Sequence, residues 1–334
     1  MADRYWVGGT ANWDGTAGTK WATTSGGTGG ASVPTSADDV FFSALSTGTC
    51  TIATGNTGAK SINCTGFTGT ITGTAAISVA GSITLASGQT YTHTGTVTIT
   101  GTGTLTTAGK TFSILVVDGV GITVTLGDAL SLSVRDITVT RGTFNTANYN
   151  VTANSLISNN SNTRTITLGS STLTLTGNPP VEFTTSTNLT FNSNTSQINL
   201  SLASAQLRGG GQTFHNVSFT STSTGTRLIT GANTFNNLTL IASATGLTQL
   251  SISANQTVNG TLTCAGSSAT QRGFVLSDTI GTTRTITANA ISANDCDFRD
   301  ITLAGTAVGA SPTRAGNCGG NSGITFPASK RSEE

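Results

Sequence analysis

Residues 92–106 read THTGTVTITGTGTLT, and this stretch decides the fold class. Every even position is threonine, while Val97, Ile99 and Leu105 occupy odd positions. An alternation with a period of two predicts a β-strand with one buried and one solvated face. Threonine suits the solvated face because it is β-branched and remains compatible with water. The same alternation recurs along the chain, for example as STLTL in residues 171–175.

Short motifs repeat at a spacing of 20 to 25 residues. A four-residue pattern of a small, a polar, a threonine and an apolar residue occurs at 109–112, 211–214, 232–235 and 255–258. Thr213, Thr234 and Thr257 in this pattern are 21 and 23 residues apart. The motif RTIT also occurs twice, at 164–167 and 284–287. Repeats of this length that contain only short strands and turns are typical of the coils of a β-solenoid.

The composition favours the same architecture. Gly contributes 42 residues and Met only one, so helix is disfavoured as the main structure. In a solenoid every coil hydrogen-bonds to the coils above and below, and only one side chain in two must be apolar, which fits a hydrophobic content of 35%. A pair of β-sandwiches also matches the length, but the Cys–Trp–Cys pattern of immunoglobulin domains is missing. We therefore predict an all-β fold, a parallel β-solenoid.

The two ends differ from the middle, which predicts three segments. They are an N-terminal cap or attachment segment, a solenoid body and a C-terminal cap with a tail, at residues 1–48, 49–294 and 295–334. At about 22 residues per coil, the body holds about eleven coils. Capping is expected because an uncovered strand edge at the end of a solenoid invites aggregation.

The predicted N-terminal cap is dense in aromatic residues. They are Tyr5, Trp6, Trp13, Trp21, Phe41 and Phe42. Two interpretations remain open for this group. The side chains can form an apolar plug over the first coil, or they can form a docking surface, since Trp and Tyr are strong interface anchors. We take all six as candidate attachment residues.

The predicted C-terminal cap is rich in charge. Asp295, Asp297 and Asp300 surround Arg299, and we expect them to form ion pairs with it. A calcium site is not expected because the glycine and glutamate positions of a calcium loop are missing. Residues 312–334 are expected to form a loop-like tail.

No catalytic residue, metal ligand or cofactor site is expected. Asp118, Asp136 and Glu182 are the acidic residues that a glycan-cleaving β-helix would have to bring together, and we interpret them as turn residues. His93 occupies an odd position of the strand pattern, so we expect a hydrogen-bonded side chain in or near the core. The five cysteines are interpreted as small buried side chains, and their oxidation state is left open.

The charge pattern excludes several classes of partner. Fifteen Lys and Arg residues balance 14 Asp and Glu residues, so neither nucleic acid nor an anionic membrane is an expected partner. No stretch of about 18 apolar residues predicts a membrane span, and residues 1–6 do not resemble a secretory signal. The outward threonine ladders have two open interpretations, a carbohydrate-binding surface or simply an uncharged soluble face.

The ends of the chain resemble a known group of proteins. RYWVGGTANW at residues 4–13 and VPTSADDVFF at 33–42 resemble the start of β-helical virion proteins of tailed bacteriophages. CDFRDI at 296–301 and GNSGITF at 320–326 are similar to segments that flank the same kind of Thr/Gly-rich body. The resemblance covers nearly the whole chain, but only its ends are distinctive.

The resemblance implies a non-enzymatic structural component of a phage virion, either a capsid decoration protein or a tail fibre or spike protein. Its expected partners are other virion proteins and host surface carbohydrate, and its expected oligomer is a homotrimer. The expected location is the virion, after synthesis in the host cytoplasm without a signal peptide. Two alternatives remain open: a tailspike-like polysaccharide depolymerase and a bacterial surface adhesin.

Overall fold

The structure, a computed structural model, describes residues 2–54 and 57–327. The chain divides into two compact units. Unit 1 holds residues 1–171 and 187–192, and unit 2 holds residues 172–186 and 193–334. Both are parallel β-solenoids, which confirms the predicted fold class, and together they contain about 13 turns. No α-helix occurs in the described part of the chain.

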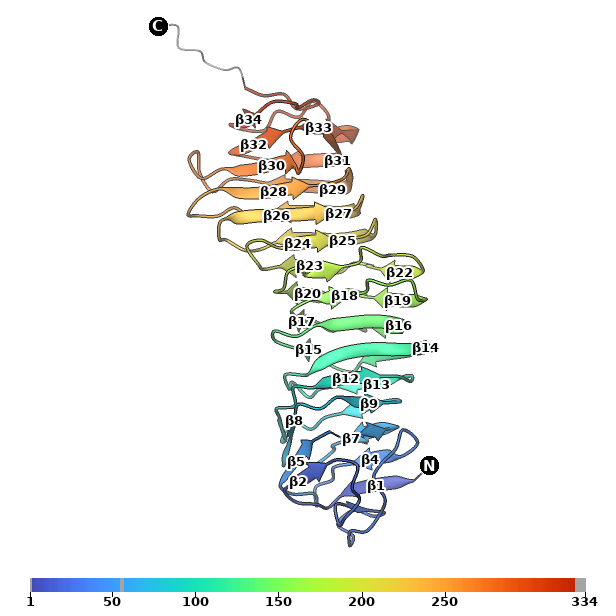
Figure 1. Ribbon diagram of the computed structural model, residues 1–334. Coiled ribbons are helices and arrows are strands. Elements are labelled where there is room, and N and C mark those ends of the chain that lie inside the picture. Colours follow the sequence, from blue (N-terminus) through green and yellow to red (C-terminus); the bar gives the residue numbers. More distant parts are fainter. Residues whose placement is uncertain (1, 55–56, 328–334) are drawn as a thin grey trace, which may run out of the picture. The chain divides into compact units, whose positions relative to one another are not determined.

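The strands of unit 1 are short, and tight turns connect them (Figure 1). They are β1 (Asp3–Trp6), β2 (Ala11–Trp13), β3 (Trp21–Ala22), β4 (Asp39–Phe41), β5 (Thr49–Ile52), β6 (Gly58–Ala59), β7 (Ser61–Asn63), β8 (Thr70–Gly73), β9 (Ile77–Val79), β10 (Ile83–Thr84), β11 (Thr90–Tyr91), β12 (Thr96–Ile99), β13 (Gly103–Thr106), β14 (Ile114–Leu126), β15 (Leu130–Ser131), β16 (Ile137–Asn145), β17 (Val151–Ala153), β18 (Leu156–Ile157), β19 (Arg164–Thr167) and β22 (Leu189–Asn192).

The strands of unit 2 include several of seven to nine residues. The elements are β20 (Thr172–Leu175), β21 (Val181–Glu182), β23 (Gln197–Leu200), β24 (Gln206–Arg208), β25 (Thr213–Phe219), β26 (Gly225–Thr230), β27 (Thr234–Leu240), β28 (Thr248–Ile252), β29 (Gln256–Cys264), β30 (Gly273–Ser277), β31 (Arg284–Ser292), β32 (Cys296–Arg299), β33 (Ile301–Ala304), the short 3₁₀ helix η1 (Gly305–Ala307) and β34 (Gly316–Asn317).

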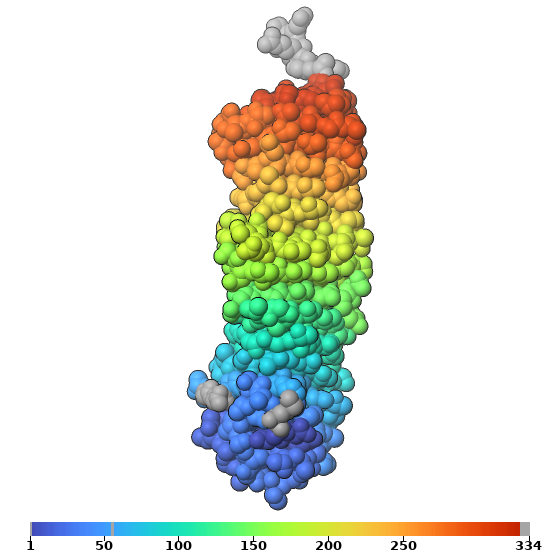
Figure 2. All heavy atoms as spheres, turned by 90° about the vertical axis from the view of Figure 1, so that its right-hand side faces the viewer, coloured from blue at the N-terminus to red at the C-terminus, as the bar shows by residue number. Residues whose placement is uncertain are grey.

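The core of unit 1 is a set of apolar ladders. Ile83 pairs in parallel with Ile62 of the preceding coil and with Leu105 of the following coil, and all three side chains are buried. Each coil therefore presents an apolar side chain at the same position as its neighbours. The colours of the space-filling view follow one another in bands within each unit, because each coil packs on its neighbours in sequence (Figure 2).

The alternation in residues 92–106 is confirmed, but the stretch is not one strand. Its apolar residues at odd positions are buried, and its threonines at even positions face outward. The chain turns a corner between β12 and β13, and Gly101 lies in that corner. A Cβ atom at Gly101 would lie 1.7 Å from the carbonyl oxygen of Ala80, so the adjacent coil leaves room only for glycine. A period of two cannot reveal such a corner, because the alternation continues through it.

The predicted repeat of unit 2 is confirmed in its register. Thr213 pairs with Thr234, which pairs with Thr257, so residues 21 and 23 apart in sequence lie side by side. The following residues, Phe214 and Phe235, stack with their ring centroids 5.6 Å apart. The repeated motif thus corresponds to successive coils of one solenoid.

An aromatic cluster fits the predicted cap at the N-terminal end of unit 1. Trp21 contacts both Trp6 and Trp13 edge to face, each with ring centroids 5.1 Å apart. Phe42 packs beside these rings and contacts Phe67 of the following coil at 5.2 Å. The cluster joins the apolar ladders to the end of the unit, so the core is closed by side chains.

The parallel ladder extends into both predicted caps. β1 pairs in parallel with β4, and β4 with β7, although β1 also pairs antiparallel with β3. At the C-terminal end of unit 2, β32 pairs in parallel with β34. The terminal segments therefore contain coils of their own, which explains why the turns exceed the eleven predicted for residues 49–294.

Ion pairs tie the C-terminal coils of unit 2 together, but not in the pattern predicted from sequence. Asp297 makes a two-point contact with Arg272, at 2.6 and 2.8 Å, and Asp295 makes one with Arg314, at 2.6 Å for each bond. Only Asp300 pairs with Arg299, at 3.5 Å. The prediction that Arg299 serves all three carboxylates is wrong, because adjacent coils bring arginines from residues 272 and 314 closer. Residues 328–334 of the predicted tail lie outside the described residues.

Candidate functional site

The six candidate attachment residues divide into two groups. Four of them have side chains that are at most 1% exposed: Trp6, Trp13, Trp21 and Phe42. These four rings belong to the core and cannot anchor a partner without unfolding the cap. Tyr5 and Phe41 are half-buried and remain accessible. The candidate docking surface therefore narrows to these two residues.

Tyr5 and Phe41 form one aromatic pair on the outer face of the first coils. They are register partners in β1 and β4, and their rings stack at 4.7 Å with an interplanar angle of 16°. The strand alternation explains their position, because the neighbouring residues Trp6 and Val40 point inward. We call Tyr5 and Phe41 the aromatic pair. A stacked pair held by two hydrogen-bonded strands is a rigid surface feature, as interface anchors usually are.

An ion pair flanks the aromatic pair on the same sheet. The Nζ atom of Lys60 donates to Asp39 at 2.9 Å, and the hydroxyl of Ser61 donates to the other carboxylate oxygen. Burial alone would raise the pKa of Asp39, but the hydrogen bonds from Ser61 and Lys60 outweigh it and lower the pKa. Asp39 thus stays charged, and the surface around the aromatic pair is polar.

The structure gives each of the acidic residues considered for catalysis its own partner. Asp118 accepts a hydrogen bond from Arg141 at 2.6 Å, and Asp136 accepts one from Asn154 at 2.8 Å. Glu182, in unit 2, accepts a hydrogen bond from Arg208 at 2.9 Å. These contacts link successive coils, which is a structural use of a carboxylate.

Asp118 and Asp136 lie too far apart to act as a pair. Asp136 immediately precedes Ile137, the register partner of Leu115, whereas Asp118 lies three residues beyond Leu115. The two carboxylates are therefore offset by four residues along the strands, or about 13 Å. Pairs of catalytic carboxylates in glycosidases are about 5 to 9.5 Å apart.

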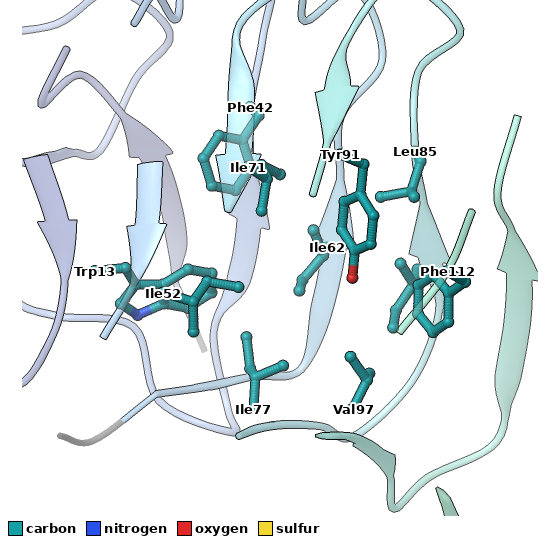
Figure 3. A pocket seen from close by; sticks show the side chains of 11 residues that line it. Trp13, Phe42, Ile52, Ile62, Ile71, Ile77, Leu85, Tyr91, Val97 and Phe112 are labelled. Atoms are coloured by element: carbon teal, nitrogen blue, oxygen red, sulfur yellow. The ribbon is translucent and has the colours of Figure 1, made fainter. Parts of the chain in front are cut away.

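The interior of unit 1 contains a small apolar cavity (Figure 3). Its walls include Trp13, Phe42, Ile71, Tyr91 and Phe112, whose side chains point inward from different strands. The volume is about 20 Å³, roughly the space for one water molecule. A cavity of this size and polarity is a packing gap and holds no ligand.

His93 is a buried, hydrogen-bonded core residue, as the strand pattern predicted. The Nε2 atom lies 2.8 Å from the carbonyl oxygen of Ala75, which can only accept, so Nε2 carries the proton. The Nδ1 atom lies 2.9 Å from the hydroxyl of Ser113, which also contacts the hydroxyl of Tyr91 at 3.1 Å. Burial lowers the pKa of His93, because it disfavours the charged imidazole.

A surface groove of about 530 Å³ is the feature of unit 1 that sequence reasoning missed. Its lining residues come from three successive coils and are Val120, Gly121, Arg141, Gly142, Thr143, Asn162, Thr163, Arg164 and Thr165. We call it the unit 1 groove. The available sequence signal was the pair of interruptions DGVG at 118–121 and SNNSNT at 158–163, which break the alternation on two neighbouring coils.

Unit 2 carries a shallower polar groove of about 220 Å³ along a ladder of amides. Asn216 and Asn237 are register partners, and the side-chain amide of Asn237 donates to that of Asn216 at 3.0 Å. The side-chain oxygen of Asn237 in turn accepts from the backbone of Thr261 at 2.8 Å. These amides bond to one another, which leaves them less available to a ligand than the groups of the unit 1 groove.

The cysteines and the metal search assign no further site. Cys50, Cys64, Cys264 and Cys296 are buried free thiols, as expected of small core residues, and Cys318 is an exposed free thiol. No cluster of three or more His, Cys, Asp or Glu side chains within residues 2–54 and 57–327 is placed to hold a metal ion. Among the same residues, no helix has the length and apolar character needed to span a membrane.

Comparisons with protein families, with curated proteins and with solved structures find no match to this chain.

Proposed function

We propose that this protein is a non-enzymatic structural component of a tailed-bacteriophage virion. In this proposal it is a capsid decoration protein or a tail fibre or spike protein that projects from the particle and contacts host glycans. The observation that carries the proposal is a parallel β-solenoid with an aromatic plug at its N-terminal end and one accessible aromatic pair beside that plug. A β-solenoid fold is consistent with tailspike-like and fibre-like proteins.

Further support comes from the ends of the sequence and from the surface. Residues 4–13 and 33–42 carry the resemblance to phage virion proteins, and they form the coils next to the aromatic pair. The exposed strand faces are rich in threonine and nearly uncharged, which suits a protein that must not bind nucleic acid during assembly. The partners in this proposal are other capsid or tail proteins, and the location is the virion.

The attachment role of the aromatic pair is tested by incorporation into particles. The variant Tyr5→Ser/Phe41→Ser removes two accessible rings and leaves the buried plug in place. The matched control is Tyr149→Ser, which removes an accessible ring elsewhere in unit 1. We expect purified particles to contain the control variant at the wild-type level and the double variant at less than a tenth of it, measured by quantitative mass spectrometry and immunogold labelling.

Two results would contradict this proposal in different ways. If purified particles contain none of the wild-type chain, the virion assignment is wrong. If a folded double variant enters particles as well as the wild type, the virion assignment stands and the aromatic pair is not the attachment surface.

The non-enzymatic assignment has its own test. The purified chain is incubated with capsular polysaccharide of the host, and new reducing ends are measured over time. We expect no release above the buffer control. Release that is lost in the variants Asp118→Asn or Glu182→Gln would instead identify a depolymerase.

The proposal includes a homotrimer, by analogy with other phage β-helices. Light scattering coupled to size-exclusion chromatography is expected to give three times the chain mass of 33.5 kDa. A mass of one chain at micromolar concentration would refute the trimer.

A further inference from the structure

Two insertions on alternate coils build the unit 1 groove. Asp118 pairs with Arg141 and Thr123 with Thr143, so residues 119–122 of β14 face only one residue, Gly142, on β16. Coil β18–β19 carries the second insertion. Ile157 pairs with Thr138 and Arg164 with Gly142, so the six residues between Ile157 and Arg164 face only three on β16.

The middle coil has no insertion and forms the floor of the groove. Because neighbouring strands are about 4.8 Å apart, the two projecting loops lie on strands about 9.6 Å apart. That spacing leaves room for one extended chain between the loops. The volume of about 530 Å³ is within the range of ligand-binding clefts.

Hydrogen bonds hold both walls in place without a ligand. Asp118, at the base of the first loop, is bound by the Nε atom of Arg141 at 2.6 Å. The buried guanidinium of Arg164 donates to the carbonyl oxygens of Asn162 and Ser158 in the second loop, at 2.8 and 2.9 Å. The side chain of Asn188 donates to the carbonyl oxygen of Ser161 at 2.9 Å. Preformed walls lower the entropic cost of binding.

Glycine is required in the floor. Gly142 has a φ of +82°, and a Cβ atom there would lie 2.6 Å from the carbonyl oxygen of Gly119. The first loop therefore folds down over the floor strand at this one position. The groove is a consequence of local backbone geometry and does not depend on chance side-chain rotamers.

The groups that face the groove match an acidic sugar chain. Arg141 makes one hydrogen bond within the described residues, from Nε to Asp118, so its two terminal nitrogens remain available to a ligand. The lining residues include two arginines and no carboxylate. Thr143, Asn162 and Thr163 supply hydroxyl and amide groups suited to sugar hydroxyls. Val120, which is 83% exposed, offers an apolar contact for the carbon face of a sugar ring.

Single-stranded nucleic acid is a poorer match to the same groups. Such strands are held by aromatic side chains on which bases stack, together with cationic grooves. The lining of the unit 1 groove contains no aromatic residue. The charge of the groove is thus paired with hydroxyl and amide groups and not with a stacking platform.

We propose that the unit 1 groove binds an acidic polysaccharide chain, with Arg141 bound to a sugar carboxylate and the threonine and asparagine side chains bound to hydroxyls. This inference rests on the proposed contact of the protein with host glycans and assigns that contact to one site. No bond is made or broken in this step, because the groove holds the chain by hydrogen bonds, charge and apolar contact alone.

The test is calorimetric titration of the full-length protein with defined oligosaccharides. The acidic probes are tetrasaccharides of galacturonate, alginate and hyaluronate, and the neutral probe is maltotetraose. We expect at least one acidic probe to bind, and to bind at least about tenfold more tightly than maltotetraose, because a charge-assisted hydrogen bond to Arg141 is lost with the neutral sugar. Added salt should weaken this binding.

Two variants and two matched controls locate the site. Arg141→Gln removes the charge, and Val120→Glu places a carboxylate at an exposed position where it repels an acidic ligand and leaves the fold intact. The controls are Arg135→Gln and Val134→Glu, which make the same changes in unit 1 outside the groove. We expect each groove variant to weaken binding at least about tenfold and each control to change it less than twofold.

The inference is overturned by any of three results. These are the absence of binding to all three acidic probes, an equal loss of binding in the control variants, and tighter binding of an oligo-dT strand than of any acidic sugar. The two proposals fail separately. A chain that enters particles but binds no acidic probe refutes the groove assignment alone, and a chain that binds the probes but is absent from particles refutes the virion assignment alone.

Discussion

Replacement of Gly101 by alanine tests whether the spacing between coils controls the stability of this solenoid. Gly101 lies in the corner between β12 and β13, where the preceding coil passes closest. An added Cβ atom would lie 1.7 Å from the carbonyl oxygen of Ala80, about half of an ordinary contact distance. The backbone of Gly101 does not have a positive φ, so the substitution introduces a clash and no dihedral strain.

The expected loss of stability has two parts. The two coils must separate by more than 1 Å at this corner, and overpacking of this kind costs about 1–3 kcal/mol. The separation also stretches the hydrogen bond from the amide of Thr100 to the carbonyl oxygen of Val79, now 2.9 Å long, which is worth about 1 kcal/mol. We therefore expect Gly101→Ala to lower the free energy of unfolding by about 2–4 kcal/mol.

Gly58→Ala is the matched control for this substitution. At Gly58 the nearest atom to an added Cβ is the backbone nitrogen of Ser36, at 3.6 Å, and φ is not positive. The control should leave stability unchanged or raise it by up to about 1 kcal/mol, since alanine restricts the unfolded chain.

Urea unfolding measures the difference between the two variants. Tryptophan fluorescence reports on the N-terminal end of unit 1, because Trp6, Trp13 and Trp21 are the only tryptophans, and circular dichroism at the strand band reports on all coils. The reasoning is refuted if Gly101→Ala unfolds at the urea concentration of the wild type, or if Gly58→Ala loses as much stability as Gly101→Ala.

Four shorter predictions concern the plug, the buried histidine, the thiols and the C-terminal coils. Trp21→Ala should lower the free energy of unfolding of unit 1 by about 3–5 kcal/mol in urea titrations, because the side chain is fully buried in the plug. Lowering the pH from 7.5 to 5.5 should destabilise unit 1, because the unfolded chain binds a proton at His93 near pH 6.5 while burial lowers the pKa in the folded state. The slope is at most about 1.4 kcal/mol per pH unit and should vanish in His93→Gln. A maleimide should label one thiol, Cys318, in the native protein and five in urea; labelling of two or more in the native state would contradict the burial of the other four. Arg314→Gln should speed amide hydrogen exchange in residues 305–327, because Asp295 loses its two-point ion pair, whereas unchanged exchange would show that the pair does not hold this segment.

The candidate surface was only partly accessible to sequence reasoning. The density of aromatic residues in the first 48 positions identified the end of the solenoid where they gather, but not which rings face outward. Trp6 and Tyr5 are adjacent in sequence and point to opposite sides of one strand, so their roles depend on which face of β1 the core covers. The unit 1 groove was missed because its walls come from residues about 40 positions apart.

Local chemistry along the chain determined the fold class. The alternation of threonine with apolar residues specifies strands with one buried face, and a motif that recurs at 21 and 23 residues specifies coils of that length. Both signals are read from short stretches, because the geometry of a strand and the stacking of identical coils repeat the same contacts each time. The architecture could therefore be predicted without any long-range information.

The tertiary structure decided which side chains meet across coils. The partner of Asp295 is Arg314 and not the nearby Arg299, and the loop at 119–122 faces the loop at 158–163 across a coil that has no insertion. Such contacts depend on the accumulated lengths of every turn between the two residues, since one extra residue shifts all later side chains around the coil. Only the folded chain sums those lengths, and this is why the groove and the end-cap ion pairs became visible in the structure alone.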